Sequence, residues 1–100
     1  MTAPSPGNGR SVGSVTVRYW AAARAAAGVE CDEVSIEAGT TLKDLLDEVP
    51  RLHPDRPRLA EVVAVCSVLL GERPVGSADP ASMPVGPGAT VELLPPFAGG

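Results

Sequence analysis

One stretch of helical periodicity limits what this chain can fold into. Apolar side chains recur at Leu42, Leu45, Leu46 and Val49, and this i, i+3, i+4, i+7 spacing places them on one face of an α-helix. A helix with one apolar face must bury that face against another element. Because strand-like patterns precede and follow it, we expect one main helix packed across a small sheet.

Both ends of this expected helix carry local signals. Thr40 or Thr41 is placed to cap the first turn. Asp44 follows Thr41 at the spacing of a capping box and adds negative charge near the helix N-terminus. Pro50 marks the expected end, because the residue before a proline is pushed out of helical geometry.

Strand-like patterns lie on both sides of the helix. Val15, Val17 and Tyr19 alternate with polar residues, which is the period of a half-buried strand. The alanine-rich segment 21–28 ends on Gly28, which predicts a short helix with a left-handed cap. The other expected strands are 31–37, the later part of 59–70, a short edge strand at 74–75, and 90–94.

The most apolar of these segments is 59–70. We expect it to begin as a helical turn and to continue as the central, fully buried strand of the sheet. Pro87 and Gly88 suit a type II turn ahead of the last strand. The resulting order predicts an α+β fold, a mixed sheet of about four to five strands with one main helix across it.

Composition suggests how the chain is divided. Residues 1–13 are rich in Pro, Gly and Ser and lack the charged and apolar regions of a signal peptide, so we expect a disordered N-terminal tail. Residues 14–94 would form the single domain that 100 residues allow. Residues 95–100 would form an extended, flexible C-terminal tail.

Charge and cysteine usage exclude several classes of protein. The net charge is −4 and the chain has a single lysine, Lys43, which argues against binding to nucleic acid. No apolar run is long enough to span a membrane. Cys31 and Cys66 have neither disulfide-scaffold nor zinc spacing, so we expect a reduced, cytoplasmic protein.

The last eight residues, LLPPFAGG, favour an extended segment that points away from the domain. Pro95 and Pro96 fix an extended direction, and Phe97 can anchor the segment on a partner. Gly99 and Gly100 have no Cβ, so they can enter a channel that larger residues would block. The alternative is an ordinary frayed end. The combination favours a segment that is fed into the active site of another protein.

Strand parity predicts a surface patch beside this segment. Trp20 falls on the polar face of the first strand, with Thr16 and Arg18, and Leu94 falls on the polar face of the last strand. If the two strands are neighbours, Trp20 and Leu94 form an exposed apolar patch near Phe97, as interfaces often do. The alternatives are that the short helix covers Trp20, or that the strand ends before it.

At this point the chain resembles a known family. VTVRYWAAARAAAG, the leucine-rich helix, the apolar segment and the terminal PPFAGG are similar to the small subunit of molybdopterin synthase, the MoaD type. This family belongs to the ubiquitin-like sulfur carriers, alongside the ThiS type, and the resemblance covers residues 15–100. It implies a β-grasp fold, which agrees with the element order.

The resemblance also implies roles for particular residues. Gly100, next to Gly99, would be adenylated and then converted to a thiocarboxylate that donates sulfur to cyclic pyranopterin monophosphate. The residues that would contact partners are Trp20, Leu94, Pro95, Pro96, Phe97 and Ala98. The chain would not be an enzyme on its own and would hold no cofactor tightly.

The resemblance also implies three partners. A large subunit of the MoaE type would receive the tail, and an E1-like adenylating enzyme of the MoeB type would use ATP on it. A sulfurtransferase or cysteine desulfurase would supply the sulfur. Two alternatives stay open: a thiocarboxylate carrier for thiamine, cysteine or another metabolite, and a ubiquitin-like modifier or binding module.

Overall fold

The computed structural model describes residues 11–96, and its elements follow the expected order. The strands are β1 (Ser11–Tyr19), β2 (Cys31–Glu37), β3 (Ser67–Leu70), β4 (Arg73–Pro74) and β5 (Thr90–Leu94). The helices are α1 (Ala21–Ala27), α2 (Leu42–Leu52), α3 (Leu59–Val65) and a 3-10 turn at Pro80–Ser82. β1 begins at Ser11, ahead of the domain boundary expected at residue 14.

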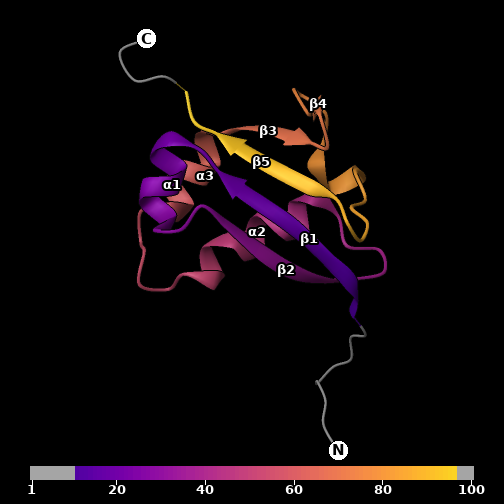
Figure 1. Ribbon diagram of the computed structural model, residues 1–100. Coiled ribbons are helices and arrows are strands. Elements are labelled where there is room, and N and C mark those ends of the chain that lie inside the picture. The colour runs from indigo at the N-terminus through magenta and orange to yellow at the C-terminus, as the bar shows by residue number, and fades with distance from the viewer. Residues whose placement is uncertain (1–10, 97–100) are drawn as a thin grey trace, which may run out of the picture.

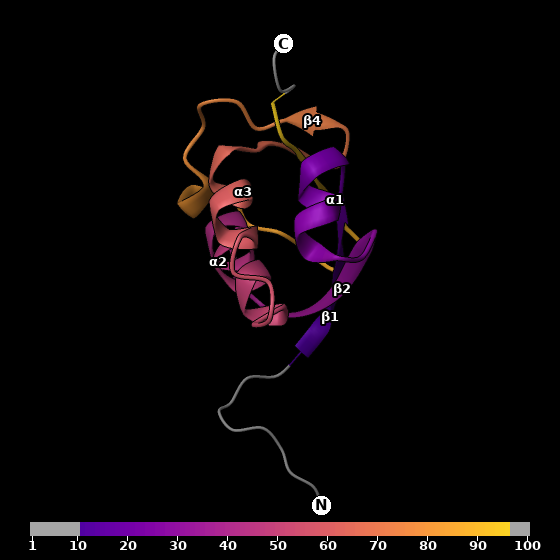
Figure 2. The same ribbon diagram turned by 90° about the vertical axis from the view of Figure 1, so that its left-hand side faces the viewer.

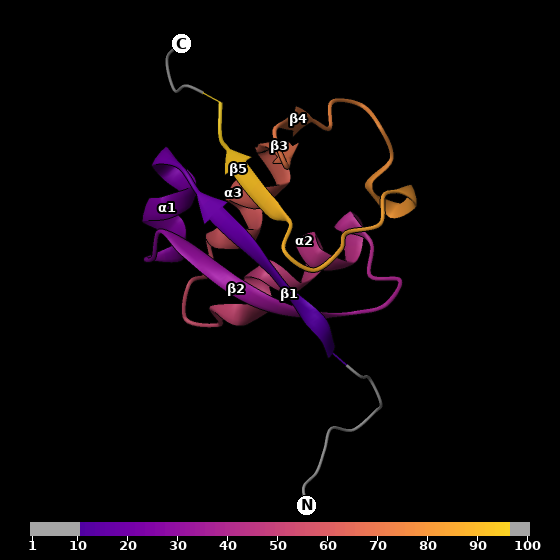
Figure 3. The same ribbon diagram turned by 45° about the vertical axis from the view of Figure 1, so that its right-hand side comes forward.

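The five strands form one mixed sheet in the order β2-β1-β5-β3-β4. β1 and β5 are parallel, and the other neighbours are antiparallel. α2 and α3 lie behind the sheet in the views of Figures 1 and 3, and Figure 2 shows the helices gathered on one side of it. This is the predicted β-grasp architecture, with α2 as the main helix.

The core fills the space between the sheet and the helices. Its members are apolar side chains from the inner face of the sheet, from the covered faces of the helices and, for Val85, from the loop before β5: Val15, Val17, Tyr19, Ala23, Ala27, Val34, Ile36, Leu42, Leu45, Val49, Leu59, Val85, Val91 and Leu93. Alternate residues of β1, β2 and β5 are in this set, which is the period of a sheet with one covered face.

Local chemistry explains where two of the elements begin and end. α2 starts with a capping box: Thr41 Oγ1 accepts the Asp44 N–H at 3.1 Å, and an Asp44 carboxylate oxygen accepts the Thr41 N–H at 3.0 Å. α1 ends at Gly28, whose φ of +82° is the left-handed cap that glycine adopts without steric cost. Both features were predicted.

The predicted end of α2 at Pro50 is wrong. The helix continues to Leu52, with Pro50 inside its last turn, and the His53 N–H donates to the Pro50 carbonyl at 3.2 Å. Pro50 removes the hydrogen bond to the Leu46 carbonyl and its ring crowds that carbonyl, so the last turn needs another source of stability. Leu52 packs against the core, and this burial favours the extra turn.

The segment 59–70 also differs from the prediction. It divides into α3 and β3, and the central strand of the sheet is β5, not β3. Leu59, Val62 and Val63 follow helical spacing and pack toward the core, whereas Val65 is 60% exposed at the end of α3. A continuous apolar run does not by itself distinguish a buried strand from a helix.

The turn before β5 has the predicted form. Pro87 occupies the second position, Gly88 follows with φ +86°, and the Ala89 N–H donates to the Gly86 carbonyl at 3.2 Å. These are the features of a type II turn. The turn leads the chain into β5, between β1 and β3.

Candidate functional site

The candidate site is the end of β5, where the chain leaves the sheet. β5 is held by β1 on one side and β3 on the other (Figure 1). Leu93 is fully buried on the inner face, and Leu94 is half-buried on the outer face opposite Ser67. Pro95 is half-buried and Pro96 is exposed. The central strand therefore gives the following residues a rigid base.

Trp20 lies beside this base, between β1 and α1. Its backbone N–H donates to the Leu93 carbonyl at 3.2 Å, and its indole Nε1–H donates to the Glu92 carboxylate at 2.8 Å. The Arg18 guanidinium lies 5.0 Å from the ring centroid, within the range of a cation–π contact. The indole is thus fixed in orientation while 41% of the residue stays exposed.

The register of the two strands brings Trp20 and Leu94 to the same end of the sheet. Arg18 pairs with Glu92, and Tyr19 pairs with Leu93, in the parallel ladder. β1 ends at Tyr19, so Trp20 is the next residue after the strand, as Leu94 is the next after Leu93. α1 begins at the following residue and does not cover the indole.

Half of the predicted site lies within the described residues. The structure brings Trp20, Leu94 and Pro95 to one corner of the sheet, next to Pro96. The remaining predicted residues lie outside the described part of the chain: Phe97, Ala98, Gly99 and Gly100.

The sequence interpretation missed the two residues that hold Trp20. Arg18 was assigned only to the polar face, and Glu92 was given no role. Arg18 lies two positions before Trp20, on the same face of the strand, so the cation–π contact had a signal in the sequence. The bond to Glu92 joins residues far apart in sequence and depends on the parallel pairing of β1 with β5.

Away from this corner, a cluster of titratable side chains lies on the inner face of the sheet. The Tyr19 hydroxyl donates to Asp32 at 2.7 Å, and His53 Nε2 lies 2.6 Å from the same carboxylate oxygen. Burial, followed by the Asp32 bond and charge, raises the pKa of Tyr19. His53 follows the end of α2 and is largely shielded from solvent, with a side chain only 15% exposed.

The cysteines offer no activated thiol. Cys31 is exposed, and Cys66 is half-buried at the end of α3, where burial raises the pKa of its thiol. Within residues 11–96, no three His, Cys, Asp or Glu side chains are grouped so that they could hold a metal ion. Over the same residues, no helix has the length and apolar character needed to cross a membrane.

The corner formed by Trp20, Leu94 and Pro95 is suited to docking. Its apolar groups are exposed or half-exposed, and its charged neighbours Arg18 and Glu92 are engaged by the indole. A partner that covers this corner therefore gains apolar contact. Trp is also the residue type most enriched among side chains that dominate binding energy.

Comparison with solved structures places the fold among small ubiquitin-like proteins. Small archaeal modifier protein 1 of H. volcanii has a TM-score of 0.70 at 20% identity, over 85% of this chain and 99% of that one. A Pyrococcus furiosus protein assigned as subunit 1 of molybdopterin converting factor gives 0.69 at 24% identity, over 85% and 99%. At these identities, the likeness concerns the fold alone.

A third structure contains a protein complex. It holds subunits 1 and 2 of molybdopterin-converting factor from Helicobacter pylori, with a TM-score of 0.54 at 26% identity, over 87% of this chain and 99% of that one. A search of curated proteins gave no match. The model of the ThiS family matches residues 17–100, which is nearly the whole chain. This β-grasp chain therefore belongs to the ThiS family.

Proposed function

We propose that this protein is a sulfur carrier that works through a thiocarboxylate on Gly100, as the small subunit of a molybdopterin synthase. The observation that carries the proposal is the extent of the family match, which runs through the segment Pro95–Gly100 and includes both glycines. The anchoring of that segment on the central strand supports it, because a rigid base limits the directions in which the segment can leave.

The proposed chemistry divides one difficult step into two. A carboxylate oxygen of Gly100 attacks the α-phosphate of ATP on an E1-like partner of the MoeB type, and pyrophosphate leaves. The outer sulfur of a persulfide on a sulfurtransferase or cysteine desulfurase then attacks the carbonyl carbon, and AMP leaves. A thiol of the donor enzyme cleaves the resulting acyl disulfide, which releases the thiocarboxylate and leaves a disulfide on the donor. AMP is a far better leaving group than oxide, which is the gain from the covalent intermediate. Gly99 keeps the approach to the carbonyl open.

The proposed docking residues divide into a base and an arm. Trp20 and Leu94 form the base, where a large subunit of the MoaE type packs on the corner of the sheet. The arm consists of Pro95, Pro96, Phe97 and Ala98, which would follow the groove of the partner toward its active site. The carrier binds no cofactor tightly in this scheme, acts in the cytoplasm, and contributes position rather than acid–base groups.

Intact mass tests the loading step. After co-expression with a MoeB-type enzyme, we expect the protein to carry one sulfur in place of one oxygen. A variant extended by one residue after Gly100 should fold normally and stay unloaded, because the reacting carboxylate has moved. A fully loaded extended variant, or a native chain that never gains sulfur with an active partner, would contradict the proposal.

Two other functions remain as candidates for the same chemistry or the same fold. The ThiS match is compatible with a thiocarboxylate donor for thiamine, cysteine or another metabolite. The likeness to small archaeal modifier protein 1 favours a modifier joined to lysines. Restoration of molybdopterin synthesis with a purified MoaE-type subunit separates the first proposal from a different pathway. Covalent adducts on other proteins would indicate the modifier.

A further inference from the structure

The two edge strands of the sheet differ in how much backbone they offer for pairing. The β4 edge has only two residues, one of them Pro74, so it offers little backbone for pairing. The β2 edge runs over seven residues without a proline, and within residues 11–96 only β1 pairs with β2. A long strand edge of this kind is a template for another strand.

The register shows which backbone groups of β2 are available. In an antiparallel pair, alternate residues turn their N–H and C=O groups toward the partner. The Tyr19 N–H donates to the Glu30 carbonyl at 2.9 Å, which fixes the phase of this alternation. Three residues of β2 then turn their backbone groups away from the sheet: Cys31, Glu33 and Ser35.

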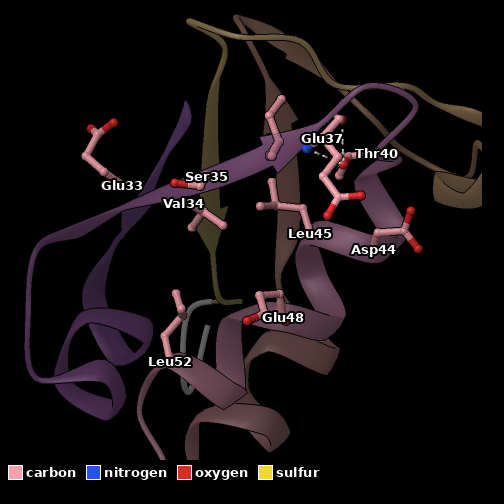
Figure 4. A pocket seen from close by; sticks show the side chains of 10 residues that line it. Glu33, Val34, Ser35, Glu37, Thr40, Asp44, Leu45, Glu48 and Leu52 are labelled. Atoms are coloured by element: carbon pink, nitrogen blue, oxygen red, sulfur yellow. Dashed lines mark hydrogen bonds between the residues drawn. The ribbon is translucent and has the colours of Figure 1, made fainter. Parts of the chain in front are cut away.

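A groove of about 390 Å³ follows this edge, between β2 and α2 (Figure 4). Its apolar lining comes from both elements, with Val34 and Ile36 from β2 and Leu45 and Leu52 from α2. A strand added to the β2 edge would place alternate side chains in this groove, because side chains of a strand point to opposite faces in turn.

The rim of the groove is acidic. Within residues 11–96, the groove is bordered by the carboxylates of Glu37, Asp44 and Glu48 and by no lysine or arginine. Glu33 also borders it, but its carboxylate points away from the groove (Figure 4). Glu33 is engaged by two β1 hydroxyls, and Asp44 by the Thr41 N–H. Among the described residues, the Glu37 carboxylate forms no ion pair or side-chain hydrogen bond, and Glu48 has only an exposed contact of 3.9 Å with Arg51. Both remain open to a cation.

We propose that the β2 edge and this groove bind an extended cationic segment of a partner protein as an added strand. Its backbone pairs with Cys31, Glu33 and Ser35. Of the side chains that it turns to the groove, the apolar ones contact Leu52, and the lysines or arginines reach Glu37 and Glu48. A second copy of this chain is the poorer occupant, because antiparallel edge-to-edge pairing centred on Ser35 would bring Glu33 of each copy opposite Glu37 of the other. The proposal does not depend on the sulfur chemistry at Gly100.

A synthetic peptide whose groove-facing residues are valine and lysine in turn, with serine at the positions between, probes the site on the full chain. In nuclear magnetic resonance titrations, we expect saturable shifts in the amides of Cys31, Glu33 and Ser35 and in the methyl groups of Leu52. The same peptide with glutamate in place of each lysine should not bind. Methylation of the peptide nitrogens that face β2 should abolish binding, whereas methylation of the alternate nitrogens should not, because only the former donate to the edge.

The matched variants are Glu48→Lys and Asp47→Lys. They make the same charge change on adjacent residues of α2, but only Glu48 lines the groove. We expect Glu48→Lys to weaken peptide binding roughly tenfold and Asp47→Lys to leave it nearly unchanged. If Glu48→Lys does not fold, Glu48→Gln replaces it as the test variant.

Three results would overturn the proposal. The first is equal binding of the basic and acidic peptides, and the second is a shift map centred away from β2. The third is a set of concentration-dependent shifts of the same β2 amides without any peptide, which would assign the edge to a second copy of the chain.

Discussion

At the scale of single residues, the start of α2 shows how one carboxylate acts on a helix. Asp44 accepts the Thr41 N–H, and the adjacent Thr41 hydroxyl accepts the Asp44 N–H. The bond from the Thr41 backbone, followed by that of its side chain, holds the pKa of Asp44 below its ordinary value of 3.8. Two backbone donors that the helix leaves unpaired are satisfied in this way.

Asp44→Asn should therefore destabilise the protein at neutral pH only. A carboxylate whose pKa is lowered on folding stabilises the fold above its unfolded pKa, and this stabilisation is lost as the pH falls through the folded pKa. We expect the melting temperatures of the native chain and Asp44→Asn to differ at neutral pH and to converge in acid below pH 3.8. A constant difference across this range would contradict the argument. As a reference, Thr41→Ala should cost about 1 kcal/mol at neutral pH.

At the scale of elements, the cluster of Tyr19, Asp32 and His53 joins β1, β2 and the end of α2. Asp32 shares one carboxylate oxygen between the tyrosine hydroxyl and the histidine ring, whose centroid is 6.4 Å from that of Tyr19. Tyr19 is 3% exposed, and the Asp32 side chain is 22% exposed. A buried polar contact of this kind fixes how the end of the helix sits on the sheet.

Titration of the one tyrosine tests this cluster. Because the pKa of Tyr19 is raised on folding, its contribution to stability is present below about pH 10 and is lost as the pH rises beyond that. We expect the tyrosinate absorbance to appear only above the pH of ordinary tyrosine and together with unfolding. In Asp32→Asn, ionisation should begin at lower pH but stay above the ordinary value, since burial is the larger cause. Ordinary titration in the folded native chain would contradict the contact.

The same elements show which parts of the fold the sequence could predict. The apolar face of α2, its capping box and the alternation in β1 are local patterns, and the structure confirms them. The centre of the sheet and the place of His53 depend on contacts between distant segments. The burial of Leu52 carries α2 past Pro50, and local rules for proline do not include that burial.

The candidate site was likewise only partly predictable from the sequence. Parity within each strand placed Trp20 and Leu94 with the polar faces of β1 and β5, and both are at least partly exposed at one end of the sheet. Parity could not show that Glu92 accepts the indole N–H, because that bond requires knowledge of which strands are neighbours and in which register.

At the scale of the whole molecule, the two proposed surfaces lie on different parts of the sheet. The corner with Trp20 and Leu94 belongs to the end of β5, in the middle of the strand order. The groove with Glu48 follows β2, an edge strand, and β1 separates the two. In the two proposals taken together, a cationic segment and a partner of the tail would contact different surfaces of the sheet.

Leu94→Asp and Glu48→Lys should separate the two functions. Leu94→Asp puts a charge in the proposed apolar interface, so we expect it to weaken heterodimer formation with a MoaE-type subunit about tenfold or more. It should leave binding of the valine–lysine peptide unchanged. We expect Glu48→Lys to weaken peptide binding and to leave heterodimer formation unchanged, and Asp47→Lys to leave both interactions unchanged. Calorimetry on each pair gives both affinities. The contradicting result is a variant, either Leu94→Asp or Glu48→Lys, that weakens both interactions while its melting temperature stays native. The two binding sites would then overlap, and a single partner would have to reach from the β2 edge to the end of β5.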